Sequence, residues 1–418
     1  MTGRTMSKIE QVEDLLKTHI GENKSIVDVK IENLVAPGEN NGGELFKLEI
    51  ITRHSEKGTE ETYHAVAKKI PSNEVAQRIF NIQQTFKGEI NFYDKVVPAL
   101  QNFQRENGVK NVLDCFAKFY GARINLDENS EVVDENAVIM LENLQISGLI
   151  NVDRHVGYDF ESAELLLRDL ASLHAVPLAM KLKDPKMFED KVKRYCVNTF
   201  NFDESKKNEN AYIFSLFIQE ILWESDKCSS FIPKVKEILK APIQFQPEVR
   251  EPFATFAHTD LWVNNAMIKI ENGTPVANKF VDFQTYNYGS PASDLLFFLY
   301  SSVRQDVLEM DLDTLINHYH SEFIKNLTEL GCDTSPFLLP KFKEELALEA
   351  KHTLGHILMF ITKIVFSEKN KTLFPPENGN PPDMTSSSFI DEMKNNTHSK
   401  AKKKVWFTIQ SYGSKGWL

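Results

Sequence analysis

The stretch HTDLWVNN, residues 258–265, places a histidine, an aspartate and two asparagines around a tryptophan. It is followed by AMIKI, then ENGT, then PVANKFV and DFQ. An Asn-Gly pair between two short apolar strands predicts a β-hairpin, because a type I′ turn needs positive φ at both central residues. Such a hairpin folds the start of its first strand beside the end of its second. We therefore expect Asn265 and Asp282 to lie together, close to the loop that carries Asp260.

These three side chains would supply hard oxygen ligands. Two carboxylates and one carboxamide oxygen suit Mg²⁺, which takes a few protein oxygens and completes its shell with water and phosphate. In phosphoryl transfer one aspartate orients the attacking hydroxyl, an asparagine five positions later holds metal, and an aspartate after a hairpin holds metal too. Aspartate and asparagine also gather in loops because they accept turn conformations. The spacing from Asp260 to Asn265, the histidine, the hairpin and Asp282 together favour the metal site.

A kinase-like site also needs a cation for the phosphates, and the strand candidate YHAVAKKIP offers two lysines. Lys68 and Lys69 are adjacent, so they lie on opposite faces of a strand. Lys68 shares its face with Val66 and Ile70 and is favoured, although a lysine pair at a strand end is often an ordinary solvated feature. Glu89 lies on the apolar face of a helical segment, where a carboxylate must reach outward or meet a buried cation. We expect it to pair with Lys68.

The two halves of the chain differ in their hydrophobic periodicity. Up to about residue 141 there are five strand candidates, SIVDVKIE, LFKLEI, YHAVAKKI, FAKFYGARI and AVIML, and one long helical segment at about 73–97. From about residue 142 the periodicity is helical almost throughout, with helices near 184–200, 208–226, 311–330 and 337–365. This predicts an α+β, bilobal fold. A small antiparallel-sheet N-lobe would span residues 1–141 and a large helical C-lobe residues 142–418.

Composition limits the classes of partner. The formal net charge of −11 among 418 residues disfavours nucleic acid and anionic membrane, which both need a basic face. No window approaches the roughly 18 apolar residues of a membrane span, and the polar N-terminus has no signal-peptide core, so a cytoplasmic location is expected. Four cysteines without a C-x-x-C pair indicate neither a zinc ribbon nor a disulfide framework. We expect the basic run Lys400 to Lys404 to be solvated in a polar tail.

The motifs resemble those of a known family, the ecdysteroid kinase-like proteins of the aminoglycoside- and choline-kinase superfamily. The resemblance covers roughly residues 25–370. It rests on HTDLWVNN, the hairpin, VDFQ, SPASDLLFF, LASLHA (170–175), KKIP (68–71), EINFYDKVVPAL (89–100) and MLENL (140–144). It implies a protein-kinase-like fold with ATP and Mg²⁺ as cofactors.

The resemblance also implies a role for each matching residue. Lys68 would bind the nucleotide phosphates and Glu89 would pair with it. Asp260 would be the catalytic aspartate, with Asn265 and Asp282 as magnesium ligands.

Further roles follow from the same resemblance. His258 would brace the catalytic loop, and Asp294 would be a structural acid in the helix after the metal site. MLENL would be the interlobe linker, with backbone groups of Leu141, Glu142 and Asn143 meeting adenine.

The chain departs from the family pattern at two places. Thr259 stands where many relatives have glycine, and we expect an extended loop to tolerate it. The turn GENNGGELF lacks a G-x-G-x-x-G pattern. Asn41, Gly42 and Gly43 are therefore candidates for phosphate contact, and a plain hairpin turn explains them equally well.

The favoured function is an ATP-dependent small-molecule kinase, and the resemblance implies a steroid alcohol such as an ecdysteroid as its substrate. A detoxifying kinase for plant or xenobiotic alcohols has the same chemistry. A catalytically inactive protein that binds a lipophilic ligand would not need Lys68, Asp260, Asn265 and Asp282 together. A metal hydrolase is weaker, since His258 and Asp260 are separated by one residue and no second metal shell can be picked out. No protein partner is evident.

The acceptor is expected to be apolar because of a long segment at 176–257, ahead of the catalytic loop. This segment is rich in aromatic residues, namely Phe188, Tyr195, Phe200, Phe202, Tyr212, Phe214, Phe217 and Trp223. Most of them are expected in the core of the helical lobe, and a minority would line the acceptor side. Such a cleft suits a flat polycyclic alcohol better than choline or an aminoglycoside, which need an aromatic cage or an acidic groove.

Overall fold

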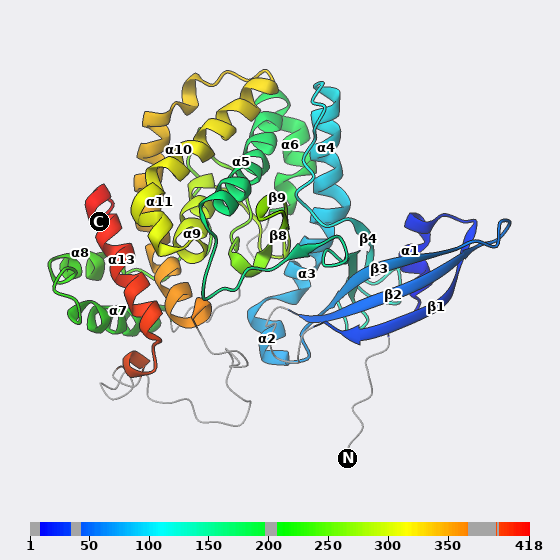
Figure 1. Ribbon diagram of the computed structural model, residues 1–418, viewed down its shortest axis with the longest axis horizontal. Coiled ribbons are helices and arrows are strands. Elements are labelled where there is room, and N and C mark those ends of the chain that lie inside the picture. The colour runs from blue at the N-terminus through cyan, green and yellow to red at the C-terminus, as the bar shows by residue number, and fades with distance from the viewer. Residues whose placement is uncertain (1–8, 35–42, 197–206, 367–389, 391–392) are drawn as a thin grey trace, which may run out of the picture.

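The computed structural model describes residues 9–34, 43–196, 207–366, 390 and 393–418. Figure 1 shows an antiparallel sheet (blue) at one side and a larger helical part beside it. The predicted α+β class, with a sheet in the N-terminal region and helices in the C-terminal region, is therefore confirmed. The division at residue 141 stays an interpretation, although the last strand of the sheet ends close by, at Glu142. No helix in the described ranges is both long and apolar enough to cross a membrane.

The N-terminal sheet has five antiparallel strands in the order β1-β2-β3-β5-β4. These are β1 (Lys24–Asn33), β2 (Glu44–His54), β3 (Glu60–Lys69), β4 (Phe119–Arg123) and β5 (Val138–Glu142). Alternation along β3 buries Ala65 and Ala67 in one small core, together with Leu16 of helix α1 (Val12–Ile20). The opposite face packs Ile70 and its neighbours against the helix that carries Phe86. Because Lys68 lies between these alternating positions, its side chain is directed to that second face.

The long helix predicted at 73–97 is interrupted. The chain forms α2 (Glu74–Ile79), α3 (Ile82–Asn91), the π-helical turn η1 (Phe92–Val96) and α4 (Val97–Glu106). The break lies at Asn81, whose φ of 48° is left-handed, a conformation that asparagine tolerates better than most residues. The apolar periodicity continues across the break, which is why it predicted one helix.

The C-terminal part is built on long helices. They are α5 (Phe160–Lys183), α6 (Pro185–Lys191), α7 (Lys207–Trp223), α8 (Ile232–Ile238), α9 (Pro291–Ser302), α10 (Gln305–Glu329), α11 (Leu339–Phe360) and α13 (Ser399–Lys415). The side chain of Asp159 caps α5 by accepting a hydrogen bond from the backbone of Ser162. Helix α5 is buried through most of its length and packs along α10. It forms the centre of the core.

Short strands lie among these helices and carry the loops of the site. They are β6 (Leu149–Ile150), β7 (Thr255–Ala257), β8 (Ala266–Glu271), β9 (Thr274–Phe280) and β10 (Asn287–Gly289). Strands β6, β8 and β9 form one sheet, and β7 pairs with β10. The polar loops that contain Asp260 and Asp282 therefore leave the core at the end of β7 and the end of β9.

The aromatic residues of the 176–257 segment that the structure describes differ in their burial. Phe188, Phe214 and Phe217 are buried in the large core, which confirms the core interpretation for them. Tyr212 and Trp223 are exposed on α7. Phe200 and Phe202 lie outside the described residues, and Tyr195 is partly buried against the core.

The expectation of a solvated tail at Lys400 to Lys404 is wrong, because this run opens helix α13. Ala401, Val405 and Ile409 recur at helix spacing and are fully buried. Lys404 lies on the same face, and its Nζ donates a hydrogen bond to the carbonyl of Val303 at 2.6 Å. The high density of lysines in this segment made its apolar helical periodicity hard to recognise in the sequence.

The first prediction concerns Lys404. Burial lowers its pKa to about 7, although Asp306 and Glu309 oppose the shift. An unfolded lysine titrates near about 10.4, so the unfolded chain binds the proton more tightly and stability rises with pH between about 7 and 10. Lys404→Met is expected to stabilise the protein by roughly 1–4 kcal/mol at pH 7 and by less at pH 10. Thermal melts at both pH values measure this.

The control for that experiment is Lys403→Met, because Lys403 is the exposed neighbour on the same helix. It should leave both melting temperatures nearly unchanged. A lower melting temperature for Lys404→Met at pH 7 would show that the hydrogen bond to Val303 outweighs the burial of the ammonium group.

Candidate functional site

The predicted hairpin is present and brings the polar loops together. Asn272 and Gly273 form its turn with φ of 52° and 82°, as a type I′ turn requires. Strands β8 and β9 pair from Ala266 opposite Phe280. The backbone N–H of Val281 then donates to the carbonyl of Asn265 at 3.0 Å. Asn265 and Asp282 therefore leave the hairpin at the same end.

Asp260 and Asn265 contact each other directly across the loop. Asn265 Nδ2 donates to Asp260 Oδ2 at 3.0 Å and to the carbonyl of Asp260 at 2.9 Å. Burial raises the pKa of Asp260 well above its usual range, and the negative charge of Asp282 adds to the shift, while the hydrogen bond from Asn265 opposes it. A carboxylate in such surroundings is a stronger base than one in water.

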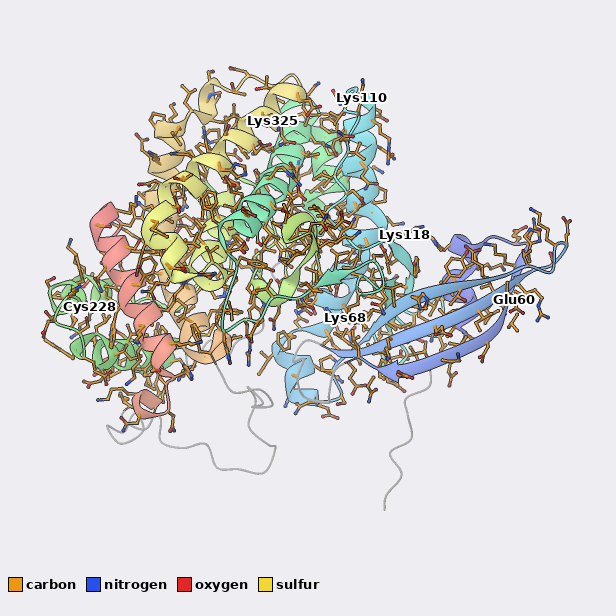
Figure 2. The ribbon with its side chains drawn as sticks, in the orientation of Figure 1. Glu60, Lys68, Lys110, Lys118, Cys228 and Lys325 are labelled. Atoms are coloured by element: carbon orange, nitrogen blue, oxygen red, sulfur yellow. The ribbon has the colours of Figure 1, made fainter. Side chains whose placement is uncertain are left out.

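Lys68 joins the N-terminal sheet to the end of the hairpin. Its Nζ lies 2.6 Å from Glu89 Oε2 and 2.6 Å from Asp282 Oδ1. Burial lowers the pKa of Lys68, but the charges of Asp282 and Glu89 outweigh burial and hold it above its usual range. The ammonium group is therefore charged. Figure 2 shows Lys68 where the sheet meets the helical part, and Lys68, not Lys69, reaches this cluster.

A single buried carboxylate, Asp294, holds the backbone of the loop that leads to Asp260. Asp294 Oδ2 accepts from the backbone N–H of His258 at 2.6 Å, and Oδ1 accepts from that of Thr259 at 2.8 Å. Burial alone would raise the pKa of Asp294, but hydrogen bonds from His174 and from the His258 backbone lower it. The charged carboxylate at the start of α9 thus fixes the loop.

His258 has no free ring nitrogen, because both bind the backbone around it. Its Nε2 donates to the carbonyl of Val281 at 3.1 Å, and its Nδ1 accepts from the N–H of Asp260 at 3.3 Å. Burial lowers its pKa, so the imidazole is neutral and links the loop to the residue before Asp282. With both nitrogens bound to the backbone, His258 is placed to hold the loop and not to react with a substrate.

The backbone at Thr259 differs from the extended conformation that we expected. Its φ is 67°, in the left-handed region, which costs a β-branched residue about 1–3 kcal/mol. The Thr259 hydroxyl donates to the carbonyl of Thr285 at 2.8 Å, and its N–H binds Asp294. These two bonds hold the strained residue where glycine would need no such support.

His174 is a site residue that the sequence reasoning did not single out. Its Nε2 lies 3.0 Å from Asp294 Oδ2, and its Nδ1 lies 2.7 Å from the hydroxyl of Tyr319. All three side chains are fully buried. The signal was present as the histidine of LASLHA, but its partners are far away in the chain and only the fold brings them together.

The expected nucleotide-contacting groups are placed as follows. The backbone N–H groups of Glu142 and Asn143 already donate to the carbonyls of Lys118 and His64, and Leu141 pairs with Val66 in the sheet. Asn41 and Gly42 lie outside the described residues. Gly43 precedes β2, and a Cβ there would lie 2.5 Å from the Lys69 carbonyl, so only glycine fits.

The donor set at the hairpin end fits Mg²⁺. It contains the carboxylates of Asp260 and Asp282 and the amide of Asn265, all oxygen ligands of the kind that Mg²⁺ prefers. No described residue donates a hydrogen bond to Asn265 Oδ1 or Asp282 Oδ2, so both oxygens remain available. Within the described ranges no group of three or more His, Cys, Asp or Glu side chains gathers as a metal site.

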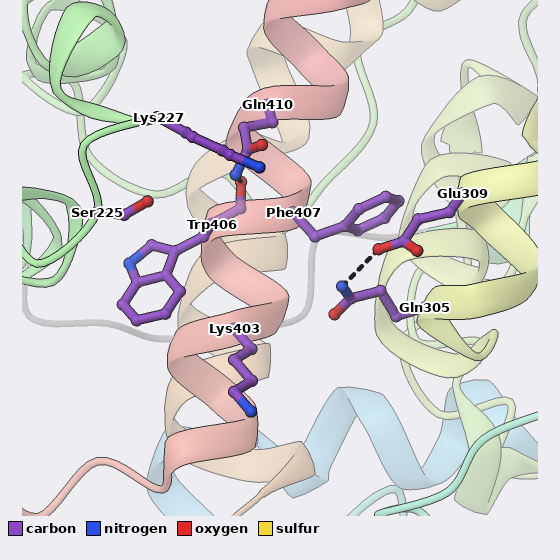
Figure 3. Close-up of a pocket in the computed structure, with 8 residues that line it drawn as sticks. All are labelled: Ser225, Lys227, Gln305, Glu309, Lys403, Trp406, Phe407 and Gln410. Atoms are coloured by element: carbon purple, nitrogen blue, oxygen red, sulfur yellow. Dashed lines mark hydrogen bonds between the residues drawn. The ribbon is translucent and has the colours of Figure 1, made fainter.

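A separate cavity of about 300 Å³ lies between α10 and α13 (Figure 3). Its lining residues are Ser225, Lys227, Gln305, Glu309, Lys403, Trp406, Phe407 and Gln410. Gln305 Nε2 donates to Glu309 Oε1 at 2.7 Å within it. None of these residues belongs to the cluster around Asp260, so the cavity is not part of the candidate site.

Similarity to solved structures is distant. The chain is 14% identical, with a TM-score of 0.36, to a GDP complex of a mutant aminoglycoside 2'-phosphotransferase-IIIa, covering 84% of this chain and 100% of that one. The chain is also 14% identical to the GDP and kanamycin complex of APH(2")-IIIa, with a TM-score of 0.36. That match covers 80% of this chain and 92% of the other. For the GDP complex of wild-type aminoglycoside 2'-phosphotransferase-IIIa the identity is 13% and the TM-score 0.35. That match covers 78% of this chain and 93% of the other. No curated protein matches the sequence.

The family comparison is more extensive. The model of the ecdysteroid kinase-like family matches residues 37–332, which is well over half of the 418 residues. The matched range contains Lys68, Glu89 and the loop and hairpin from His258 to Asp282. The chain therefore belongs to the ecdysteroid kinase-like family.

Proposed function

We propose that this protein is an ATP- and Mg²⁺-dependent kinase that phosphorylates a hydroxyl group of a steroid alcohol, an ecdysteroid in particular. Membership of the family supports a small-molecule kinase. The observation that carries the proposal is the continuous polar cluster in which Lys68 contacts Glu89 and Asp282, while Asn265 contacts Asp260 at the same end of the hairpin.

Each side chain of this cluster has one task in phosphoryl transfer. Asp260 accepts the proton of the acceptor hydroxyl as that oxygen attacks the terminal phosphate. Lys68, kept charged by its two carboxylates, contacts the phosphates, and Glu89 holds the lysine in place. Asn265 and Asp282 would hold Mg²⁺, which neutralises negative charge on the transferred group.

The two alternatives predict different results. A detoxifying kinase would share this cluster and differ only in the alcohol that it accepts. An inactive ligand-binding protein has no need for a charged lysine, a base and two oxygen ligands around one loop, and burying such groups is costly without a function. Mass spectrometry of steroid and plant-alcohol mixtures incubated with protein, Mg²⁺ and ATP separates all three, because it reports which compound, if any, gains a phosphate.

The second prediction concerns what the acceptor site binds. Calorimetric titration in the presence of a non-hydrolysable ATP analogue should show binding of a hydroxylated steroid in the micromolar range, on the order of −8 kcal/mol. Choline and aminoglycosides should not bind, because they need an aromatic cage or an acidic groove, whereas the proposed acceptor is a neutral, largely apolar alcohol. Preferential binding of choline over every steroid would overturn the substrate class and leave the kinase assignment standing.

A further inference from the structure

The cavity of about 300 Å³ beside α13 lies over one face of that helix. Four residues of the helix line it, at spacings of three and four: Lys403, Trp406, Phe407 and Gln410. Residues at these spacings share one side of a helix. Figure 3 shows the side chains of Trp406 and Phe407 leaving α13 on opposite sides. We call this space the α13 cavity; its floor is a helix face with an aromatic ring at each side.

The walls of the α13 cavity come from two other parts of the fold. The connection between α7 and α8 contributes Ser225 and Lys227, and the first turns of α10 contribute Gln305 and Glu309. In Figure 3 these two pairs lie on opposite sides of α13. Three segments that are distant in the sequence therefore enclose one space, which the packing of α13 against the molecule creates.

The positive charges of the α13 cavity are not neutralised by the protein. Lys227 and Lys403 both line it, and neither ammonium group forms a hydrogen bond or ion pair with any residue in the part of the chain that the structure describes. The adjacent Lys402, by contrast, binds the carboxylate of Glu224 at 2.9 Å. Acidic residues outnumber basic ones in the chain, 59 to 48, yet none is placed to pair with these two lysines.

One carboxylate lines the α13 cavity, and it already has a partner. Glu309 Oε1 accepts a hydrogen bond from Gln305 Nε2 at 2.7 Å, on the α10 side of the cavity. Two lysines against one glutamate leave the lining with a net positive charge. Such a lining attracts an anion and disfavours a cation.

The aromatic walls are apolar where they meet the cavity. The indole N–H of Trp406 donates to the carbonyl of Ile221 at 2.8 Å, so the polar atom of this ring is already satisfied by the protein. Phe407 has no polar atom, and both rings are only partly buried. Pockets that combine apolar walls with a few polar or charged groups are typical of small-molecule sites.

The volume limits the size of a ligand. One water molecule takes about 30 Å³ of liquid, so a cavity of about 300 Å³ holds roughly ten groups of that size. This is at the small end of the range for ligand pockets, about 300–1,000 Å³. A short chain or a single ring system with one head group fits, and a whole lipid does not.

We infer that the α13 cavity is a binding site for a small amphipathic anion. The apolar body of the ligand lies on the face of α13 between Trp406 and Phe407, and its carboxylate or phosphate head binds Lys227 and Lys403. None of these residues belongs to the cluster around Asp260. The inference therefore goes beyond the proposed function and does not depend on it.

The test compares ligands of one shape and different charge. Octanoate matches the volume, octanamide has the same shape without the charge, and octyl phosphate carries a more negative head. Calorimetric titration of the full-length protein, without nucleotide, should give a Kd for octanoate on the order of 0.1–1 mM. Octanamide should bind roughly 3- to 20-fold more weakly, as expected for two partly exposed charge contacts. The tighter of octanoate and octyl phosphate identifies the preferred head group.

Lys227→Gln combined with Lys403→Gln should weaken octanoate binding by the same factor, roughly 3- to 20-fold, and leave octanamide unchanged. The matched control combines Lys341→Gln with Lys343→Gln, which removes two charges from exposed positions of α11 outside the cavity lining. This control should bind octanoate as the wild type does. An equal loss in both double variants would show only a long-range effect of net charge and would overturn the inference.

The position of the ligand is tested with 8-bromooctanoate, because bromine quenches the fluorescence of a tryptophan that it contacts. Titration should quench the wild-type protein, and most of this quenching should be lost in Trp406→Phe, which keeps an apolar ring. Quenching that persists in Trp406→Phe, or equal affinity for octanoate and octanamide, would refute the site. None of these measurements requires turnover, so their outcome and that of the kinase assays can be told apart.

Discussion

Asp260→Asn is expected to lower kcat by roughly 10²- to 10⁴-fold while nucleotide affinity changes little. The asparagine has the same size and can still accept the hydrogen bond that Asn265 Nδ2 gives to Asp260 Oδ2 at 3.0 Å. It cannot take a proton from the acceptor hydroxyl. Steady-state kinetics with a phosphorylated acceptor, together with titration of a non-hydrolysable ATP analogue, measure the two quantities separately.

The matched control is Asp169→Asn, because Asp169 forms a similar pair elsewhere. It lies on α5, burial raises its pKa, and it accepts a hydrogen bond from Asn278 Nδ2 at 2.7 Å. The control should change stability and leave kcat near the wild-type value. Unchanged turnover in Asp260→Asn would refute the proposed mechanism. A loss shared equally by both variants would indicate a general structural effect.

Asp282→Ala is expected to abolish detectable phosphorylation. The change removes a proposed magnesium ligand, and the metal is what offsets the charge on the transferred phosphate. It also removes one of the two carboxylates that hold Lys68, at 2.6 Å. Activity is measured over a wide range of Mg²⁺ concentration, because excess metal should restore little when a carboxylate ligand is missing.

Two further variants separate the metal from the lysine. Glu89→Gln removes the other carboxylate beside Lys68 and should weaken nucleotide binding without shifting the Mg²⁺ concentration needed for half-maximal activity. Asn265→Ala should raise that concentration, because the amide oxygen is lost. Wild-type magnesium dependence in both Asp282→Ala and Asn265→Ala would mean that the metal assignment is wrong.

Much of the site was predictable because its residues are close in the sequence. The type I′ hairpin follows from Asn272 and Gly273 alone, and a hairpin necessarily returns Asp282 to Asn265. Strand alternation selected Lys68 over Lys69, and the helical period placed Glu89 on an apolar face. Each of these rules depends on a few neighbouring residues, so each can be applied to the sequence without knowing the tertiary structure.

Features that depend on distant contacts were missed or predicted wrongly. The left-handed φ of Thr259 is stable only because Asp294 and Thr285 bind its backbone and hydroxyl. The solvated tail proved to be helix α13, because packing against the rest of the molecule buries Lys404 among apolar neighbours. The local propensities of the residues predict neither the conformation of Thr259 nor the burial of Lys404.

The sequence by itself determined the class of fold, the hairpin and the set of polar side chains that meet at its end, since periodicity and turn chemistry act over short distances. The tertiary structure alone decided that His174 and Asp294 hold the 258–265 loop, and that Lys404 is buried with its Nζ donating to the carbonyl of Val303. His174 and Asp294 are 120 residues apart in the sequence, and Lys404 and Val303 are 101 residues apart. Their hydrogen bonds depend on how whole helices pack, which no local pattern encodes.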